Sequence, residues 1–461
     1  MEVFETELTN IVFVLFATDF ILKSHICFFC LDIQRKITNF AENFQLDYLQ
    51  NMKRKIINDP IHGFISIPND FLYEILQHRF TQRLNRIRQL GVASLVYPCA
   101  THTRFSHSLG AMFLTNEAIK NLRLKGHQIT DNEADAVMAA ILLHDIGHYP
   151  YSHLLENTLI QGVSHEQISV VLMEKINAEM GGKLDLAIRI FKNRYQKNFL
   201  HQLISSQLDM DRMDYLMRDS YFTGVVEGTV GSARIIKMFD IVDDNLVLEQ
   251  KGILSVENYL IARRFMYWQV YFHKTSIAAE MMLKNILNRA KELCLNGEKL
   301  FATPSLLYFL KNNNINAENF LENEETIEYF VDIDDSDIVS AIKVWANHSD
   351  KVLSILCKNF TNRVLFKTSL VQESVDENTL AKYAYEKERY IVDKLRINAA
   401  DGHYFSGYQI VENDTYNLQD NSIMVLLSDG STKDLSQVST ILTPNSLNHD
   451  AEKNYLCYYK L

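Results

Sequence analysis

A strongly apolar stretch that ends in an adjacent histidine and aspartate limits the folds open to this chain of 461 residues. Residues 136–143 read AVMAAILL and contain no glycine or proline, so we expect a helix buried in the core. His144 and Asp145 follow directly, and Gly147 and Pro150 then predict the end of the helix. A buried carboxylate is costly unless it is paired or bound to a metal ion. The pair therefore indicates either a metal site or a core histidine beside a capping aspartate.

Two further segments supply potential ligands for the same metal ion. His107 lies in THTRFSHSLGAMFL, which continues as a helix with an apolar face. Asp211 lies in SSQLDMDRMDYLMRDS, where Tyr215 and Asp219 follow at i+4 and i+8 on one helical face. Two imidazoles and two carboxylates suit a divalent ion such as Mn, Mg, Fe, Co or Zn, with positions left for water. The set contains no thiolate, which argues against a structural zinc site. The four predicted metal ligands are His107, His144, Asp145 and Asp211.

Together with their neighbours, these segments resemble the HD-domain metal phosphohydrolases. Within that family the chain is most similar to the deoxynucleoside triphosphate (dNTP) triphosphohydrolases, the branch that includes bacterial dGTPases. The similar segments occur in the family's order between Asn58 and Lys274 and read INDPIHGFI, QRLNRIRQLG, THTRFSHSLG, HDIGHYPYSH, SHEQ and DMDRMDYLMRD. The resemblance implies metal-dependent hydrolysis of a dNTP to a deoxynucleoside and inorganic triphosphate.

The resemblance also implies roles for side chains around the four ligands. His148 and His165 would contact phosphates or relay protons, and His153 would assist at the leaving oxygen. Glu156 stands where the family carries a carboxylate near these histidines. The alternative interpretation is that the three histidines are surface side chains in a turn-rich loop. The predicted catalytic residues are His148, His153, His165 and Glu156.

A second group of residues matches family positions that contact the nucleotide. Arg104 suits a phosphate clamp because a guanidinium can bind two oxygens at once. Tyr215 would stack on the sugar and exclude a 2′-hydroxyl. Alternatively, Tyr271 belongs to a stripe of aromatic core residues. Phe272 stands where some relatives have a glutamine, so no preference for a particular base is inferred. The predicted substrate-binding residues are Arg104, Gln89, Leu90, Tyr215, Asp219, Arg263 and Tyr271.

Composition favours a large cytoplasmic enzyme. Hydrophobic residues make up 47% of the chain, which is ample for a sizeable core. The net charge of −11 does not favour nucleic acid as an obligatory partner, and six scattered cysteines indicate reduced thiols. The apolar stretch 11–22 is short and interrupted for a membrane span, and the acidic start is unlike a signal peptide. We interpret residues 1–51 as an extension, either an upstream translation artefact or a loosely attached helix.

Most of the chain after this extension shows helical spacing of apolar residues. The predicted helices are Phe71–Leu90, Glu133–Leu143, His165–Met180, Phe199–Arg218, Val256–Leu295 and a charged helix at Glu386–Asn398. Turn residues predict hairpins at Ile241–Gly252 and Ser422–Ser436. We therefore predict a mainly α protein with an all-helical core at residues 52–295 and a smaller α+β region at 296–461.

The resemblance suggests partners as well as a substrate. Relatives form dimers or tetramers, so we expect a homo-oligomer and place the arginine-rich segment Arg79–Arg88 at a subunit interface. An activating nucleotide is a further partner suggested by some relatives. Lys55 and Gln82 fit that activating site, but Gln77 and Asn85 do not. Activation by a guanine nucleotide is therefore not inferred.

Three functions agree with these patterns. The first is a dNTP triphosphohydrolase. The second is another HD-domain phosphohydrolase that acts on nucleoside monophosphates, cyclic nucleotides or alarmones. Arg104, Tyr215 and Asp219 favour the first over the second, because a monophosphatase has no need of this combination. The third is a non-catalytic nucleotide sensor, which would have no need of an intact metal quartet.

Overall fold

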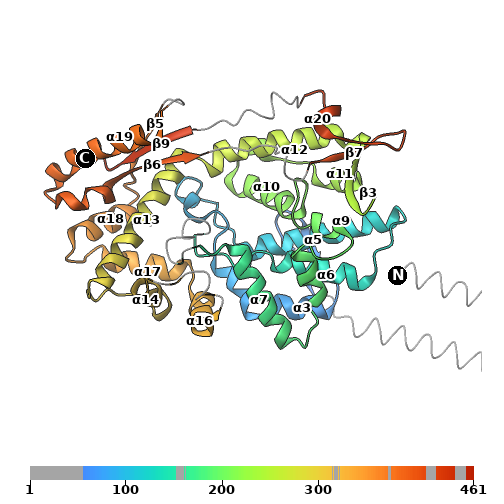
Figure 1. Cartoon of the computed structure of the whole chain (residues 1–461), viewed down its shortest axis with the longest axis horizontal. Coiled ribbons are helices and arrows are strands. Elements are labelled where there is room, and N and C mark those ends of the chain that lie inside the picture. Colours follow the sequence, from blue (N-terminus) through green and yellow to red (C-terminus); the bar gives the residue numbers. More distant parts are fainter. Residues whose placement is uncertain are drawn as a thin grey trace, which may run out of the picture. The chain divides into compact units, whose positions relative to one another are not determined.

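The computed structural model describes residues 55–151, 160, 162–313, 315, 320, 322–371, 375–411, 422–441 and 453–460. The chain from Ile56 to Leu461 forms one compact unit, mainly helical with small sheets and a C-terminal β region, as predicted (Figure 1). The predicted extension 1–51 lies outside the described residues, and the boundary at residue 295 stays a prediction. No helix in the described ranges is long and apolar enough to cross a membrane.

Three helices form the centre of the molecule. Helix α5 (Arg104–Leu124) packs against both α6 (Asp131–Leu143) and α10 (Met210–Thr223). Thr130 and Glu133 form a capping box that fixes the start of α6. From Ala136 to its last residue, every side chain of α6 is buried. The apolar sequence of α6 thus confirms the prediction of a core helix that ends directly before His144.

Two predicted helices are interrupted by residues that cap a new helix. The stretch predicted as Phe71–Leu90 begins as α3 (Asp70–Gln77) and restarts as the short helix α4 (Arg79–Arg83), because His78 is extended and its ring accepts the Phe80 N–H. The stretch predicted as Phe199–Arg218 divides into α9 (Asn198–Gln202) and α10. Here Asp209 is extended and its carboxylate accepts the Arg212 N–H.

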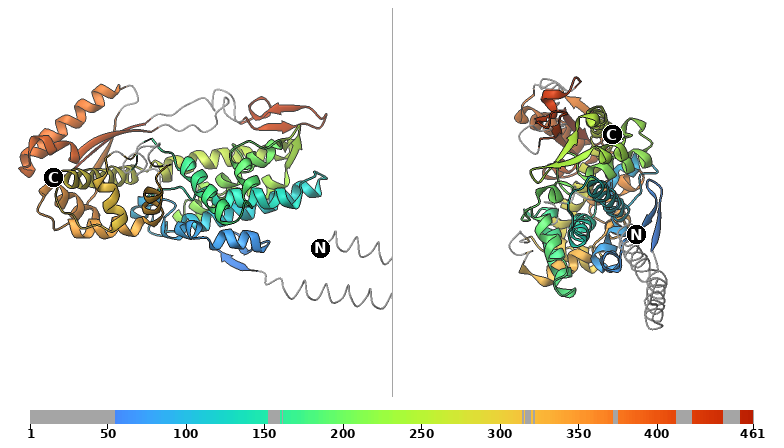
Figure 2. Two further views of the ribbon diagram at one scale, coloured as in Figure 1. Left: turned by 60° about the horizontal axis from the view of Figure 1, so that its bottom comes forward. Right: turned by 90° about the vertical axis from the view of Figure 1, so that its right-hand side faces the viewer.

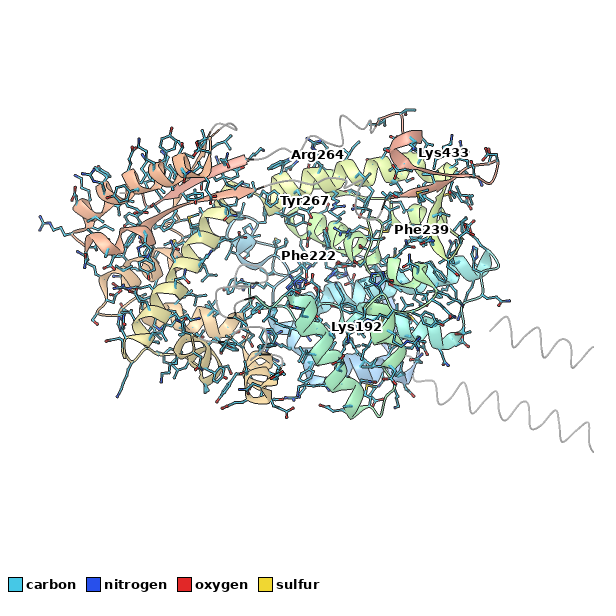
Figure 3. All side chains as sticks on the ribbon, viewed as in Figure 1. Lys192, Phe222, Phe239, Arg264, Tyr267 and Lys433 are labelled. Atoms are coloured by element: carbon cyan, nitrogen blue, oxygen red, sulfur yellow. The ribbon has the colours of Figure 1, made fainter. Side chains whose placement is uncertain are left out.

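The predicted helix Val256–Leu295 is interrupted as well. It consists of α12 (Ile253–Met266), a π-helical turn (Tyr267–Tyr271) and α13 (Lys274–Leu295). The N-cap of α13 is His273, whose extended backbone ends the turn. Figure 3 labels Tyr267 at the point where α12 gives way to this turn. The remaining helices of the first part are α7 (His165–Glu179), α8 (Asp185–Phe191) and α11 (Ser232–Lys237).

Both predicted hairpins are present. Strands β3 (Phe239–Val242) and β4 (Asn245–Glu249) are joined by Asp243 and Asp244, which adopt positive φ angles of 49° and 58°. Strands β7 (Met424–Leu426) and β8 (Thr432–Asp434) form the second hairpin. Strand β7 pairs in parallel with β4, so the hairpins join in one sheet of order β3-β4-β7-β8. Figure 2 shows the red strands β7 and β8 next to the green hairpin.

The other strands were not predicted. An N-terminal hairpin pairs β1 (Ile56–Asp59) with β2 (Gly63–Ser66). A three-stranded sheet has β9 (Lys453–Tyr458) in the middle, between β5 (Lys367–Val371) and β6 (Ser406–Val411). The helix predicted at Glu386–Asn398 starts earlier, at an N-cap on Asp376. The remaining C-terminal elements are α14 (Pro304–Lys311), α16 (Glu324–Asp332), α17 (Asp335–Trp345), α18 (Lys351–Thr361), α19 (Glu377–Leu395) and α20 (Leu435–Val438).

Candidate metal centre and active site

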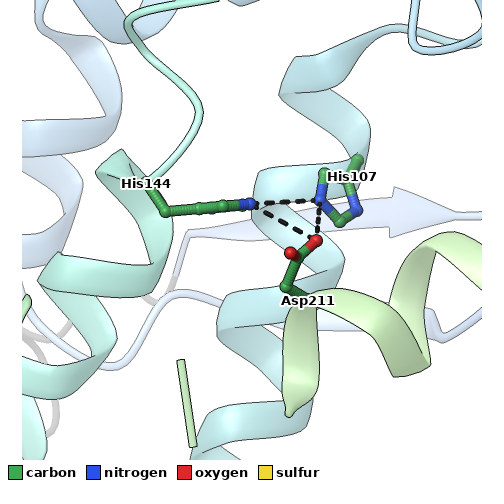
Figure 4. A group of neighbouring side chains, drawn as sticks. All are labelled: His107, His144 and Asp211. Carbon is green, nitrogen blue, oxygen red and sulfur yellow. Dashed lines mark hydrogen bonds and ion pairs between the residues drawn. The ribbon is translucent and has the colours of Figure 1, made fainter. Parts of the chain in front are cut away.

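Three helices bring His107, His144 and Asp211 to one point (Figure 4). His107 lies near the start of α5, His144 directly follows α6, and Asp211 lies in the first turn of α10. The Nε2 atom of His107 is 3.3 Å from Nε2 of His144 and 3.0 Å from Oδ1 of Asp211. The same Asp211 oxygen is 3.5 Å from Nε2 of His144. The three side chains can therefore hold a single ion.

Asp145 brings a second carboxylate to this point. Its Oδ1 lies 3.2 Å from Nε2 of His144, and its Oδ2 lies 3.8 Å from Nε2 of His107. Two imidazole nitrogens and two carboxylates form a donor set that fits a divalent cation such as Mn²⁺, Fe²⁺ or Zn²⁺. The four predicted ligands thus converge, and the cluster is consistent with divalent metal binding.

The charges at the cluster favour a cation. Burial alone would lower the pKa of His107, but hydrogen bonds with Asp211 and Asp214 raise it to about 10. Burial would also raise the pKa of Asp211, but His144 and His107 hold that pKa well below its ordinary value. In the metal-free protein the site therefore holds protons that a divalent cation would replace. Metal binding should weaken as the pH falls, because protons compete for the same nitrogen and oxygen atoms.

The second ring nitrogen of each histidine ligand has its own partner. Nδ1 of His107 lies 2.8 Å from Oδ2 of Asp214, and Nδ1 of His144 lies 2.6 Å from the carbonyl oxygen of Ile141. Both partners are acceptors, so the Nδ1 atoms carry the protons and donate them. The lone pairs on Nε2 are then directed to the metal point. Neither partner was predicted, although Asp214 lies one helical turn after Asp211.

Asp214 is the centre of a largely buried ionic network. Besides binding His107, it accepts hydrogen bonds from Nε2 of His62 at 2.7 Å and Nε of Arg218 at 2.9 Å. Arg218 donates from Nη1 to Oδ2 of Asp59 at 2.8 Å. Burial would raise the pKa of Asp214, but Arg218, His107 and His62 keep it well below its ordinary value. The motif INDPIHGFI contributes Asp59 and His62 to this network. The network in turn positions Asp214, which holds the ring of His107.

Gly110 allows α5 to approach this network. A Cβ atom at Gly110 would lie 2.0 Å from Oδ1 of Asp214 and 2.3 Å from Nη2 of Arg218. No side chain can be accommodated without moving the buried ion pair. The glycine in THTRFSHSLG is therefore required by packing against the carboxylate that holds His107.

Gly147 has a packing role in addition to its predicted place at the end of the helix. Helix α6 ends at Leu143, a few residues before Gly147, which is not among the residues with positive φ. A Cβ atom there would lie 2.2 Å from the carbonyl oxygen of His165 and 2.4 Å from the backbone nitrogen of Ser169. Ser169 accepts the Gly147 N–H at 2.9 Å and donates to the carbonyl oxygen of His144 at 2.7 Å. Gly147 therefore permits α7 to pack tightly against the ligand-bearing turn.

Arg104 and His148 lie next to Asp145, one of the predicted metal ligands. Nη1 of Arg104 donates to Oδ2 of Asp145 at 2.5 Å, and Nε2 of His148 lies 3.2 Å from Oδ1. Burial and Arg104 lower the pKa of His148 well below its ordinary value, so its ring is neutral at pH 7. The rings of His148 and His165 stack with centroids 3.9 Å apart. His153 and Glu156 lie outside the described residues, and their roles stay predictions.

A cavity of about 1240 Å³ opens beside the metal cluster. His107 lies behind the wall, where it is fully buried, and Arg263 is not among the lining residues. Most of the predicted site residues line the cavity, and they include the three predicted metal ligands other than His107. The predicted residues that line it are Gln89, Leu90, Arg104, His144, Asp145, His148, His165, Asp211, Tyr215, Asp219 and Tyr271.

Tyr215 and Tyr271 form an aromatic corner of the cavity. Their ring centroids are 6.1 Å apart, edge to face. The Tyr271 hydroxyl donates to Oδ2 of Asp219 at 2.7 Å, and Nε2 of His102 lies 2.7 Å from the other oxygen of the same carboxylate. Tyr271 therefore lines the cavity, together with Tyr267, in place of a purely core position. Neither His102 nor Tyr267 was predicted as part of the site.

One arginine lies behind the polar wall and another lines it. Arg263 is buried and donates from Nη1 to Oε1 of Gln207 at 2.8 Å, and its contact with the substrate stays a prediction. Arg212 lines the cavity directly, with its Nε donating to Asp209 at 3.1 Å. Sequence reasoning missed Arg212, although it follows Asp211 in DMDRMD. A cation at this point adds positive charge to the cavity wall beside the metal ligands.

The C-terminal region braces the loop that follows His144 and Asp145. Arg83 is fully buried and donates from Nη1 to the carbonyl oxygen of His148 at 2.8 Å and from Nη2 to that of Ile333 at 3.3 Å. Asp335, the first residue of α17, accepts the N–H groups of Tyr151 at 3.1 Å and Arg88 at 3.0 Å. One carboxylate thus ties the loop that carries His148 to the segment that leads into Gln89 and Leu90.

The arginine-rich segment that we predicted at a subunit interface makes ion pairs within the chain. Arg79 pairs with Glu328 at 2.7 Å and Arg86 pairs with Asp334 at 2.7 Å. Arg83 of the same segment is buried, and its guanidinium contacts the carbonyl oxygens of His148 and Ile333. Formation of a homo-oligomer stays a prediction.

Comparisons with known proteins agree with this geometry. Residues 104–219, which contain all four ligands, match the HD domain, and residues 230–304 match the HD-associated region. The crystal structure of a phosphohydrolase from Bacteroides thetaiotaomicron is 53% identical in sequence and superposes with a TM-score of 0.85, covering 88% of this chain and all of that one.

Two curated relatives mark the extent of the similarity. The uncharacterized protein YwfO of Bacillus subtilis is 35% identical over 323 residues, which are 68% of this chain and 72% of YwfO. The deoxynucleoside triphosphate triphosphohydrolase SAMHD1 homolog of Dictyostelium discoideum is 29% identical over 274 residues, and the match spans 53% of that protein. This chain therefore belongs to the HD-domain phosphohydrolases that carry the HD-associated region.

Proposed function

We propose that this phosphohydrolase cleaves dNTPs into a deoxynucleoside and inorganic triphosphate. The observation that carries the proposal is that the HD metal cluster opens into the same cavity as Arg104, His148, His165 and the aromatic corner of Tyr215 and Tyr271. One end of this arrangement suits a polyphosphate, and the other suits a sugar. The relatives named dNTP triphosphohydrolases support the proposal, although the match spans about half of their length.

The chemistry follows from the residues around the cluster. A divalent cation held by the four ligands would lower the pKa of a bound water and polarise a phosphoryl oxygen. Arg104 and Arg212 would stabilise the negative charge of the phosphate oxygens, and the neutral ring of His148 can accept or donate a proton there. Water attacks the α-phosphorus, the bond to the 5′-oxygen breaks, and that oxygen takes up a proton. The triphosphate leaves intact.

The sugar end of the cavity gives the proposal a test of its own. Tyr215 stacked on a deoxyribose leaves no room for a 2′-hydroxyl, so ribonucleotides should be poorer substrates by at least ~10-fold, the effect of leaving one polar group unaccommodated. We expect this preference in assays of the four dNTPs and their ribonucleotide counterparts, each with Mn²⁺ and Mg²⁺. Tyr215→Ala should weaken the preference, whereas Tyr215→Phe, which keeps the ring, should retain it.

Two results would contradict this proposal. Equal rates for deoxyribonucleotides and ribonucleotides would show that the aromatic corner does not select the sugar. Inactivity of the metal-loaded protein on every dNTP would remove the function itself. Each variant's thermal melting curve controls for folding, because Tyr215 packs against the core.

A further inference from the structure

One face of α13 lines the cavity beyond the metal centre. Ser276, Glu280 and Lys284 follow one another at intervals of four residues, and so lie on one side of the helix. Beside this polar stripe runs a second one with the same spacing, made of Ile277, Met281 and Asn285, and all six residues line the cavity. The helix therefore offers polar groups next to apolar surface on a single wall.

Glu280 lacks a partner of its own. Among the residues that the structure describes, neither Glu280 nor Lys284 makes a hydrogen bond or an ion pair. Burial alone raises the pKa of Glu280 to about 7. A carboxyl group so placed is unfavourable unless something in the cavity offers it hydrogen bonds. A ligand with N–H donors would meet this need.

The surroundings of the two stripes suit a flat ring. Phe272 lines the cavity directly before α13 and packs against Tyr267 and Trp268, with ring centroids 5.6 and 5.7 Å away. Small residues, Ala381 and Ala384 of α19 and Gly407 of β6, line the cavity as well. At Gly407 a Cβ atom would lie 2.8 Å from the sulfur of Met281, so β6 approaches α13 closely. Aromatic, apolar and small side chains together leave room for a planar heterocycle.

We propose that this face of α13 is the subsite for the base of the substrate, and that Glu280 and Lys284 select guanine. The inference rests on the proposed function, since it takes the ligand to be a nucleoside triphosphate. A carboxylate can accept the adjacent N1–H and N2–H of guanine together, and an ammonium can donate to O6. Bound guanine, with its two N–H donors and Lys284 nearby, would hold Glu280 in the ionised form, and adenine would present the unprotonated N1 to that carboxylate. Phe272 has no polar group to offer, which leaves base selection to the next turns of the helix.

The test compares kcat/KM for dGTP and dATP in the wild-type protein and in Glu280→Gln. We expect the wild type to prefer dGTP and Glu280→Gln to lower the dGTP-to-dATP ratio by ~10–100-fold, mainly through KM for dGTP, because one hydrogen-bonded edge is mismatched. Lys284→Met should lower the ratio by less. Retained turnover of dATP shows that each variant is folded. The matched control is Glu292→Gln, on an exposed part of α13 outside the cavity.

Failure of this subsite differs from failure of the function. A wild-type protein that hydrolyses dNTPs, but whose dGTP-to-dATP ratio is the same in Glu280→Gln and Lys284→Met, would overturn the base subsite and leave the function standing. A wild-type protein inactive on all dNTPs would overturn both. If Glu280→Gln loses activity on both nucleotides, the ratio measured for Lys284→Met decides.

Discussion

Replacement of Asp211 or His144 by alanine is expected to remove bound metal and abolish turnover while the fold is retained. Each side chain contributes an atom to the cluster in which His107, His144 and Asp211 lie within 4.8 Å of one another. Without either one, the remaining donors cannot hold the cation, and turnover should fall by at least ~10³-fold because the water is no longer activated. Metal content by mass spectrometry and initial rates measure the two effects together.

The control for these variants is His127→Ala, which removes a histidine that pairs with Asp240 outside the cavity. This variant should keep both its metal and its activity. Full activity of metal-depleted Asp211→Ala protein would contradict the assignment of the cluster as the catalytic centre. Loss of metal from His127→Ala would indicate a general effect of losing histidine side chains.

Asp214→Ala should have the largest effect on stability. It leaves Arg218 fully buried with Asp59 as its remaining carboxylate partner, and it leaves the Nδ1 proton of His107 without its acceptor. Removing one partner of a buried ion pair costs about 3–5 kcal/mol of folding free energy. Asp214→Asn keeps the shape and one carbonyl oxygen, so it should lose less stability but still bind metal ~10–100-fold more weakly.

Urea unfolding and metal titration of the three proteins separate these effects. The control is Asp393→Ala on the exposed face of α19, which should change the free energy of unfolding by no more than ~0.5 kcal/mol. If Asp214→Ala unfolds at the wild-type urea concentration and binds metal with wild-type affinity, Asp214 does not support His107 in the way its hydrogen bonds indicate.

The ligands themselves could be predicted because their signals are local. The apolar run of α6 places His144 and Asp145 at the end of a buried helix, and the spacing from Asp211 to Asp219 places these side chains on one helical face. The grouping of His107, His144 and Asp211 follows from these patterns and from the family resemblance. The breaks at His78 and Asp209 were missed because a capping residue inside an apolar periodicity does not disturb that periodicity.

The supporting residues could not be predicted because they depend on contacts between distant segments. His62 lies on the β1–β2 hairpin and Asp214 on α10, and only folding brings them within 2.7 Å. Arg83 stands in a polar, arginine-rich segment, where exposure is the usual expectation. Its burial against the carbonyl oxygens of His148 and Ile333 requires the position of a segment far along the chain.

Identification of the products formed from dGTP tests the central proposal most directly. After a short incubation of the metal-loaded protein, ion-exchange chromatography separates nucleosides, nucleotides and inorganic phosphates. Attack at the α-phosphorus predicts equal amounts of deoxyguanosine and intact inorganic triphosphate, with no diphosphate or monophosphate intermediate. Release of orthophosphate or pyrophosphate in place of triphosphate would contradict the proposal and would indicate a different reaction of the HD-domain phosphohydrolases.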